Sequence, residues 1–339
     1  MIDLLVAGGG PAGLATAIHA AQSGLDVAVV EPRPTPIDKA CGEGLMPHGA
    51  RALAALGVQL AGHPLLGIRY LDHQRQAEAR FRGGPGLGVR RTLLHSALAG
   101  RVRQLGIPVL PRRVEDVHQD GERVYAAGLQ ARYLAAADGL HSPIRRQLKL
   151  SQGGVDPWPA RYGLRRHYDT APWSAFVEVH WSERAEAYVT PLSPHRVGVA
   201  VLTGARAPFA DLLADFPALR DRLPVDAAGP VRGAGPMRQR VRTRVAGRVL
   251  LVGDAAGYVD ALTGEGLSLA LTQGAALVHC IRAGRPDAYE RAWHRVTRRH
   301  RLLTQALLWA RHQPGLAPWL VPAAVRLPWL FSVLVNQLA

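Results

Sequence analysis

Three glycines near the start of the chain constrain its fold more than any other feature. Gly8, Gly10 and Gly13 follow an apolar run, 2–7, and open an alanine-rich segment of helical period, 11–23. Their spacing is G-x-G-x-x-G, in which the glycines permit a tight turn, close approach of a phosphate group and close packing of helix on strand. We therefore predict a β-α-β unit that binds a dinucleotide.

The second strand of this unit ends in an acidic residue. The apolar run 25–30 is followed directly by Glu31. A carboxylate at this strand tip can accept hydrogen bonds from a ribose diol. Pro11 suits a first helical turn, whose free N–H groups face the phosphates. The motif by itself leaves NAD and FAD both open.

The composition is that of a globular protein. A chain of 339 residues allows one large or two modest domains, and no apolar leader precedes the first predicted strand, so we expect a cytoplasmic protein. Cys41 and Cys280 are the only cysteines, and neither has a ligand neighbour at metal-binding spacing. Neither a disulfide framework nor a metal site is therefore expected.

The net charge of +15 raises the question of nucleic-acid binding. The basic residues are nearly all arginine and are spread along the chain, with Lys39 and Lys149 as the only lysines. No helix-turn-helix, zinc-finger, RNP-like or OB-type pattern organises these charges into a binding surface. We expect no nucleic-acid partner and attribute the charge to codon bias.

Two later segments repeat the pattern of strand, turn and helix. In the first, a predicted strand over 133–137 precedes Asp138 and a short helix over 142–148. In the second, a strand over 249–252 precedes Gly253 and Asp254, and a loop closing at 263–266 opens a long helix of small residues. The N-terminus of that helix offers free backbone N–H groups to an anion.

Taken together, the three motifs resemble the FAD-dependent monooxygenases and reductases with the para-hydroxybenzoate hydroxylase type of fold, in that family's order, over residues 1 to about 280. The resemblance implies FAD as cofactor and NADPH or NADH as a transient reductant. It places Glu31 at the adenosine ribose, Arg33 and Arg91 along the diphosphate and ribityl region, and Asp254 at the ribityl chain. The full set of expected FAD-binding residues is Gly8, Gly10, Pro11, Ala12, Gly13, Glu31, Arg33, Gly42, Arg91, Asp138, Gly253, Asp254, Gly264 and Gly266.

The expected fold is α/β, a Rossmann-type FAD-binding domain with an inserted antiparallel substrate sheet and C-terminal helices. The predicted segments are the first part of the FAD domain with inserted strands at about 62–90, the substrate sheet, the second part of the FAD domain and the C-terminal helices, at 1–155, 156–240, 241–285 and 286–339.

The middle segment alternates polar and apolar residues, as antiparallel strands with one polar face do. Glu178 and His180 share such a face and are candidates for catalysis by proton transfer. Arg165, His167 and Tyr188 are candidates for substrate contact. The alternative is a solvated sheet face for the four charged or titratable residues and simple packing for Tyr188.

A Cys-Gly-Glu-Gly loop begins at Cys41. It resembles a stretch found near the flavin in geranylgeranyl reductases, and that resemblance makes Cys41 a third catalytic candidate. The alternative is a cysteine that only packs.

The C-terminal segment predicts two or three helices punctuated by prolines. Apolar residues over 327–338 form a stripe at helical spacing, close in sequence to the arginines of 298–301. The stripe is too short to span a bilayer. We expect it to pack against the domain, with peripheral contact to a membrane or a lipid tail as the alternative.

Stretches such as CGEGLMP, VEVHW and YVTP are similar to actinobacterial flavoproteins associated with type III polyketide pathways, some of which hydroxylate phenolic lipids. This resemblance predicts an FAD-dependent monooxygenase that hydroxylates a phenolic or polyketide-derived aromatic substrate, using NAD(P)H and O2. The alternative is a geranylgeranyl-reductase-like enzyme that reduces isoprenoid double bonds. A halogenase is disfavoured because W-x-W-x-I-P is missing from the sequence, and a non-enzymatic flavin-binding scaffold explains fewer residues.

Overall fold

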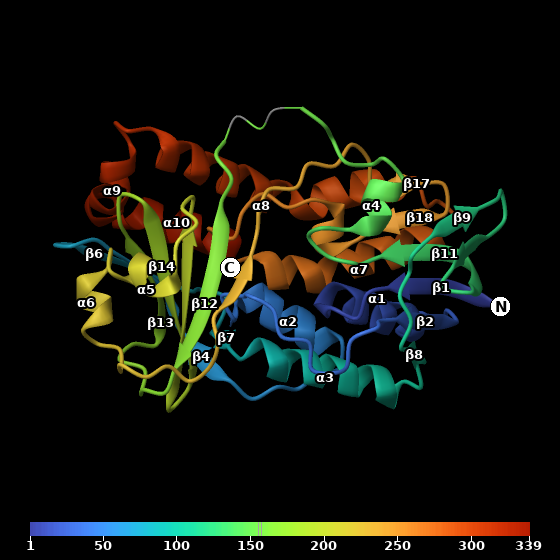
Figure 1. Ribbon diagram of the computed structural model, residues 1–339, viewed down its shortest axis with the longest axis horizontal. Helices are drawn as coiled ribbons and strands as arrows, with labels where there is room; N and C mark the ends of the chain where they lie inside the picture. Colours follow the sequence, from blue (N-terminus) through green and yellow to red (C-terminus); the bar gives the residue numbers. More distant parts are fainter. Residues whose placement is uncertain (155, 157) are drawn as a thin grey trace.

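The computed structural model describes residues 1–154, 156 and 158–339, which build two large sheets and a group of helices (Figure 1). The first sheet, at the right of Figure 1, is parallel at its centre. Its strands in spatial order are β17 (Val245–Ala246), β18 (Val249–Leu251), β11 (Leu129–Ala136), β1 (Ile2–Ala7), β2 (Val27–Val30) and β8 (Val109–Leu110), with β10 (Val124–Ala126) and β9 (Val117–Gln119) extending from β11.

The second sheet, at the left of Figure 1, is mostly antiparallel. Its strands in spatial order are β16 (Arg232–Ala234), β12 (Tyr162–Tyr168), β15 (Arg196–Thr203), β14 (Ala185–Ser193), β13 (Phe176–Trp181), β5 (Gly67–Leu71) and β6 (Gln76–Arg80). A small third sheet contains β3 (Gly44–Leu45), β7 (Gly86–Gly88) and β4 (His63–Leu65).

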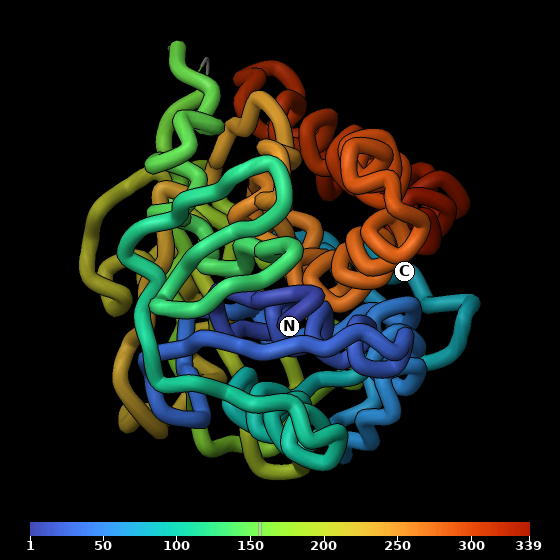
Figure 2. The backbone as a smooth tube through the Cα atoms, turned by 90° about the vertical axis from the view of Figure 1, so that its right-hand side faces the viewer, coloured from blue at the N-terminus to red at the C-terminus, as the bar shows by residue number. Residues whose placement is uncertain are grey.

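Helices cover both sheets. They are α1 (Pro11–Gln22), α2 (Pro47–Ala55), α3 (Arg91–Gln104), α4 (Pro143–Gln147), α5 (Phe209–Leu213), α6 (Pro217–Arg220), α7 (Gly266–Arg282), α8 (Ala288–His312), α9 (Leu320–Arg326) and α10 (Pro328–Leu338), with 3-10 turns η1 (Gly253–Ala256) and η2 (Ala317–Trp319). Figure 2 shows the last three helices, in orange and red, together on one side of the molecule.

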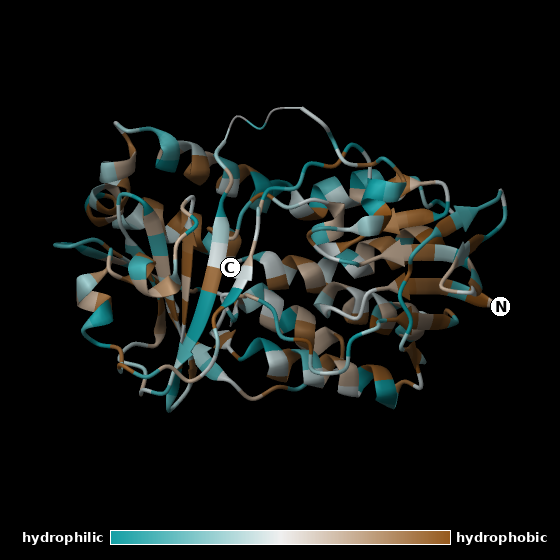
Figure 3. Cartoon of the chain, viewed as in Figure 1, coloured by the Kyte–Doolittle hydropathy of each residue, from teal (hydrophilic) through white to brown (hydrophobic). Residues whose placement is uncertain are grey.

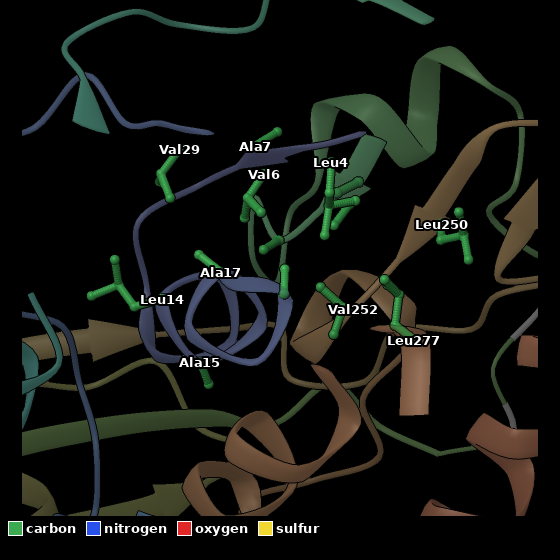
Figure 4. Packing of buried hydrophobic residues seen from close by; sticks show 14 of the residues in the cluster. Leu4, Val6, Ala7, Leu14, Ala15, Ala17, Val29, Leu250, Val252 and Leu277 are labelled. Atoms are coloured by element: carbon green, nitrogen blue, oxygen red, sulfur yellow. The ribbon is translucent and has the colours of Figure 1, made fainter. Parts of the chain in front are cut away.

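The central strands of the first sheet are apolar along their whole length because both of their faces are covered. The residues of β2 and β18 are all buried, and the apolar strands stand out in Figure 3. Figure 4 shows side chains of β1, β2, β18 and α7 gathered around α1. This layer of helix on parallel sheet is the predicted α/β unit.

Glycines bring α1 close to its neighbours. A Cβ on Gly13 would lie 1.8 Å from the carbonyl oxygen of Gly8, and a Cβ on Gly274 would lie 2.5 Å from Oγ1 of Thr16. Gly8 has φ +110°, a backbone conformation that favours glycine. These close approaches determine the shape of the turn after β1 and the packing distance between α1 and α7.

Of the strands between 62 and 90, β5 and β6 belong to the second sheet, and β4 and β7 belong to the small third sheet. They were expected as an insertion in the FAD domain, but β5 pairs in parallel with β13, and β6 pairs with β5. The second sheet is therefore assembled from two distant parts of the chain. Strand alternation indicates the faces of a strand but not the sheet that it joins.

The C-terminal helices are attached to the second sheet at several of its strands. Arg311 of α8 donates to the buried carboxylate of Glu186 on β14 and to the carbonyl oxygen of Ser182, at 3.0 Å from the latter. On α10, the ring of Phe331 packs against Tyr70 of β5, with 4.7 Å between centroids. The helices thus close one end of the space beside the sheet.

A substitution at Gly13 tests the packing of the glycine turn. Gly13→Ala puts a methyl group into a backbone oxygen and should lower the free energy of unfolding by at least about 3 kcal/mol. Gly100→Ala, in the middle of α3, is the control. Its methyl group meets only the end of the Arg103 side chain, at 3.8 Å, and should raise the free energy of unfolding by about 0.5–1 kcal/mol. Urea denaturation measures both, and a Gly13→Ala protein as stable as the parent would contradict this packing.

Candidate functional site

A cavity of about 680 Å³ lies where the two sheets meet. At one end it is lined by the glycine turn and by residues that follow β2, β11 and β18. At the other end it is lined by the second sheet and by Val335 and Leu338 of α10. The expected nucleotide-binding and substrate-binding segments therefore open into one continuous space.

The glycine turn forms the first wall. Gly10, Pro11 and Ala12 line the cavity, and a Cβ on Gly10 would meet nothing within 4 Å. Gly10 is the N-cap of α1, so the free N–H groups of the first helical turn lie at the cavity. The turn leaves space for a group to lie directly against the backbone.

Glu31 lies at the tip of β2, as predicted from the sequence. Its carboxylate accepts hydrogen bonds from the backbone N–H of Gly9, at 2.8 Å, and from Nε of Arg33, at 2.7 Å. Burial alone would raise the pKa of Glu31, but the hydrogen bonds from Arg33 and Gly9 lower it overall. Glu31 is therefore an ionised acceptor at neutral pH.

Asp138 and Asp254 follow β11 and β18 on the cavity wall. Burial raises the pKa of both carboxyl groups, and for Asp254 it outweighs the nearby charges of Lys39 and Arg91. Oδ1 of Asp138 and Nη1 of Arg91 are buried without a hydrogen-bond partner. Such atoms need a polar partner, and both residues line the cavity.

The loop before α7 provides a further wall. Gly253 has φ +66° and donates its N–H to Oε1 of Gln273 at 2.8 Å, while Gly264 has φ +71°. Glu265 is the N-cap of α7 and Gly266 its first residue. Gly264 and Gly266 both line the cavity, next to the N-terminus of this helix.

The Cys-Gly-Glu-Gly loop forms part of the cavity wall. Cys41 and Gly42 line it, and Sγ of Cys41 accepts the backbone N–H of Glu43 at 3.3 Å. Burial raises the pKa of the Cys41 thiol to about 11. Cys41 is therefore a protonated thiol at neutral pH.

Glu43 is a residue that the sequence analysis missed. Its carboxylate accepts a hydrogen bond from the backbone N–H of Arg91 at 2.8 Å. The same carboxylate lies 2.6 Å from Nε2 of His167, a residue of β12. It is 1% exposed and has φ +60°, which is unusual for a residue with a side chain. A charged residue between two glycines was the signal in the sequence.

Arg165 and His167 belong to the same buried network. Arg165 lines the cavity, donates to Asp38, and its Nη1 lies 3.2 Å from Nδ1 of His167. His167 contacts Glu43 instead of the cavity, so it holds the loop rather than touching a ligand. Of the three predicted substrate residues, Arg165 and Tyr188 line the cavity. The hydroxyl group of Tyr188 donates to the carbonyl oxygen of Leu262 at 2.7 Å.

Glu178 and His180 do not reach the cavity. Their neighbours Val177 and Val179 line it, and alternate residues of a strand point to opposite faces. Glu178 is buried on the far face, where Arg69 donates to it at 2.7 Å and His180 lies 3.2 Å away. The position of this pair does not fit the predicted catalytic role. For Glu178 it does not fit the alternative of a solvated face either, because Glu178 is buried.

Other cavity residues also went unrecognised in the sequence. Lys39 lies among the polar groups, and burial lowers the pKa of its ammonium group. Met46, Ile68, Tyr70 and the two α10 residues belong to the apolar part. Side chains of this kind have no sequence motif, because only the folded chain brings them to one wall.

The comparison with family models decides the class of protein. A model described as "FAD binding domain" matches residues 1–202, which is more than half of the chain. The chain belongs to this family. It is a flavin-dependent oxidoreductase, and the FAD-binding α/β fold expected from the sequence is confirmed.

Similar proteins agree with membership in the FAD-binding family. The menaquinone reductase of Mycobacterium tuberculosis strain H37Rv is 30% identical over 80% of this chain and 74% of its own length. Digeranylgeranylglycerophospholipid reductase 1 of Methanopyrus kandleri is 28% identical over 80% of this chain and 78% of its own. The solved structure of the flavin-dependent brominase Bmp2 has a TM-score of 0.80 at 18% identity, over 99% of this chain and 93% of that one, which shows the shared fold.

The cavity fits FAD on its own chemistry. The bare backbone at Gly10 and the unpartnered Nη1 of Arg91 suit phosphate oxygens, while the free oxygen of Asp138 suits a hydroxyl group. We propose that Gly10 and Arg91 hold the diphosphate, that Glu31 holds the adenosine ribose and that Asp254 contacts the ribityl chain.

Gly10→Val tests the diphosphate position. The new side chain enters open space, so the stability of the FAD-free protein should stay the same, while affinity for FAD should fall at least about tenfold. Titration of FAD-free protein with FAD, followed by flavin fluorescence, gives the affinity, and thermal melting gives the stability. Unchanged FAD affinity would remove Gly10 from the site.

Proposed function

We propose that this protein reduces a carbon–carbon double bond in an isoprenoid or similar apolar chain, with NAD(P)H as the source of electrons. The observation that carries this proposal is the chemistry of the cavity wall on the side of the second sheet. That wall is apolar, and its ionisable groups with shifted pKa values are held in their protonated forms. Two relatives with reductase names support the same conclusion.

The apolar part of the wall comes mainly from the second sheet and from α10. Its residues are Ile68, Val177, Val179, Ala200, Leu202, Met237, Leu262, Val335 and Leu338. A surface of this kind binds hydrocarbon by excluding water and offers little to a small polar ring. The cavity also extends from the Cys41 loop to α10, which suits a long substrate better than a compact one.

The hydroxyl and thiol groups on this wall are proton donors. Burial raises the pKa of Tyr70, Tyr188 and Tyr258 far above neutral pH, and that of Cys41 to about 11. Tyr188 already donates to a backbone carbonyl oxygen. The candidate bases that a hydroxylase of phenols would use, Glu178 and His180, lie on the other face. The Tyr and Cys groups on this wall are therefore protonated at neutral pH and are not the base that a hydroxylase of phenols requires.

These groups suit the addition of two hydrogen atoms to a double bond. FAD held at this site and reduced by NAD(P)H would supply a hydride equivalent to one carbon of the bond. We propose that the Cys41 thiol donates a proton to the other carbon and that water restores the thiol. The apolar wall excludes water from the reacting bond and holds the chain along the sheet.

Product analysis tests the reaction. FAD-loaded protein is incubated with NADPH or NADH and geranylgeraniol, with and without oxygen, and the products are identified by mass spectrometry. We expect products with two more hydrogen atoms per reduced bond, formed equally well without oxygen. Products that carry an added oxygen atom and form only in air would overturn the proposal.

Substitution of Cys41 tests the proton donor. Cys41→Ala should lower the rate of double-bond reduction by at least about a hundredfold, while reduction of bound FAD by NAD(P)H continues at the parental rate. Cys280→Ala, which removes the buried cysteine of α7, is the matched control and should leave both rates unchanged. Stopped-flow absorbance separates the two half-reactions. Equal rates of substrate reduction in the parent and in Cys41→Ala would exclude Cys41 as donor.

Hydroxylation of a phenol that carries an alkyl chain is the second candidate, as the sequence analysis predicted first. One observation favours it: Nε of Arg165 is buried without a partner on a residue that lines the cavity. A guanidinium N–H in that position suits a phenolate oxygen. Replacing geranylgeraniol with 5-pentadecylresorcinol in the product analysis tests this candidate, which requires an oxygen-dependent product with one added oxygen atom.

A further inference from the structure

The C-terminal helices expose an unusual share of the apolar surface. Of the sixteen large apolar side chains that are exposed in the described part of the chain, ten lie between 296 and 334. Those at the end of this segment are Leu316, Trp319, Val325, Leu327, Trp329, Val333 and Leu334, which we call the η2-α10 surface. Single exposed apolar residues are ordinary, but a concentration in consecutive elements marks an interaction site.

Tryptophan is distributed in the same way. The chain has seven tryptophans, and the three that are exposed in the described residues are Trp309, Trp319 and Trp329, with 52%, 52% and 65% of their surface accessible. An indole ring combines an apolar body with a polar N–H and is enriched where a membrane meets water.

The charge of this region has one sign. Residues 291–339 contain seven arginines and no lysine, aspartate or glutamate. Two of these arginines are tied to the η2-α10 surface by contacts, since Arg326 lies 5.2 Å from the ring centre of Trp319 and Arg299 donates to the carbonyl oxygen of Gln337 at 3.4 Å. An apolar surface whose own segment carries arginine as its only charged side chain is complementary to an anionic lipid surface.

Helix α10 is apolar on two faces. Phe331 packs on the sheet, and Val335 and Leu338 line the cavity. On the same helix Trp329 and Leu334 are exposed. A helix face that is apolar is normally covered, so the outer face of α10 lacks a partner in the isolated chain.

We propose that the η2-α10 surface docks onto an anionic lipid bilayer, and that a substrate chain passes from the bilayer into the cavity beside α10. No single helix among the described residues is long and apolar enough to cross a membrane, and the two helical pieces Ala317–Arg326 and Pro328–Leu338 meet at a bend of 105°. We assign them to the bilayer surface, with the exposed faces in the headgroup region. The path into the cavity rests on the proposed lipid-chain substrate, whereas the docking does not.

Vesicle flotation tests the docking without any turnover. FAD-loaded protein is mixed with phosphatidylcholine vesicles, with or without about 30% phosphatidylglycerol, and floated through a density gradient. We expect the parent to float with the anionic vesicles, less with phosphatidylcholine alone, and less again at about 1 M NaCl, because salt screens the arginines. Failure to float with anionic vesicles would overturn the proposal.

A double substitution locates the contact. Trp329→Glu with Leu334→Glu should lower the vesicle-bound fraction at least about tenfold. Val225→Glu is the matched control, since it adds a charge at a fully exposed valine outside the surface, and it should bind as the parent does. Circular dichroism and flavin absorbance check that the double variant is folded. Parental flotation of the double variant would contradict the proposed contact.

Two further readouts separate this proposal from its alternatives. Vesicles with brominated acyl chains should quench the tryptophan fluorescence of the parent, which needs no variant. Light scattering should show a monomer in solution, and a dimer that the double substitution dissociates would instead assign the surface to a second copy of the chain. If the proposed reaction is wrong, flotation and quenching persist while geranylgeraniol is not reduced, so the two failures are distinguishable.

Discussion

The buried carboxylate of Glu43 joins the parts of this molecule that the site requires. It accepts the N–H of Arg91 at the start of α3, in the FAD-binding unit, and contacts His167 on β12 of the second sheet. Its backbone, in the left-handed region, turns the loop so that Cys41 and Gly42 line the cavity. The position of the thiol relative to both sheets therefore depends on one carboxylate that is almost fully buried and on its two contacts.

The cavity and the C-terminal helices follow from this junction. The two sheets contribute different surfaces to the cavity. The first sheet and its loops offer bare backbone and polar groups, and the second offers valine, leucine and methionine side chains. The helices α9 and α10 close the apolar end with residues that have more hydrocarbon surface than the fold can bury. One chain thus provides a polar wall for the nucleotide and an apolar wall for the proposed lipid substrate, in one cavity.

The sequence was sufficient for the FAD-binding unit but not for the substrate side. Gly8, Gly13 and Glu31 act through local geometry, which a motif records, and the α/β fold followed from them. Glu178 and His180 were assigned to the wrong face for catalysis. The alternation of residues along β13 shows that the strand has two faces, but not which face lines the cavity. The helices α5 and α6 pack on the face of the second sheet that is opposite the cavity, through contacts distant in sequence such as those of Phe209 and Leu212.

The same limit explains the order of the two proposed reactions. From the sequence, a resemblance to flavoproteins of type III polyketide pathways favoured hydroxylation of a phenol, and polar residues on β13 were the candidates for proton transfer. In the folded chain these residues point away from the cavity, and Ile68 and Tyr70, brought in by β5, add to an apolar wall instead. The pairing of β5 with β13 has no local signal, because strands far apart in sequence meet only when the sheet forms.

The central claim is that FAD and a lipid chain share one cavity with the Cys41 thiol between them. A crystal structure of the protein with FAD and geranylgeraniol bound tests this most directly. The account predicts the isoalloxazine beside Cys41 and the prenyl chain along Val177, Val179 and α10, with a double bond next to the thiol. A prenyl chain bound elsewhere, or a flavin ring remote from Cys41, would contradict it.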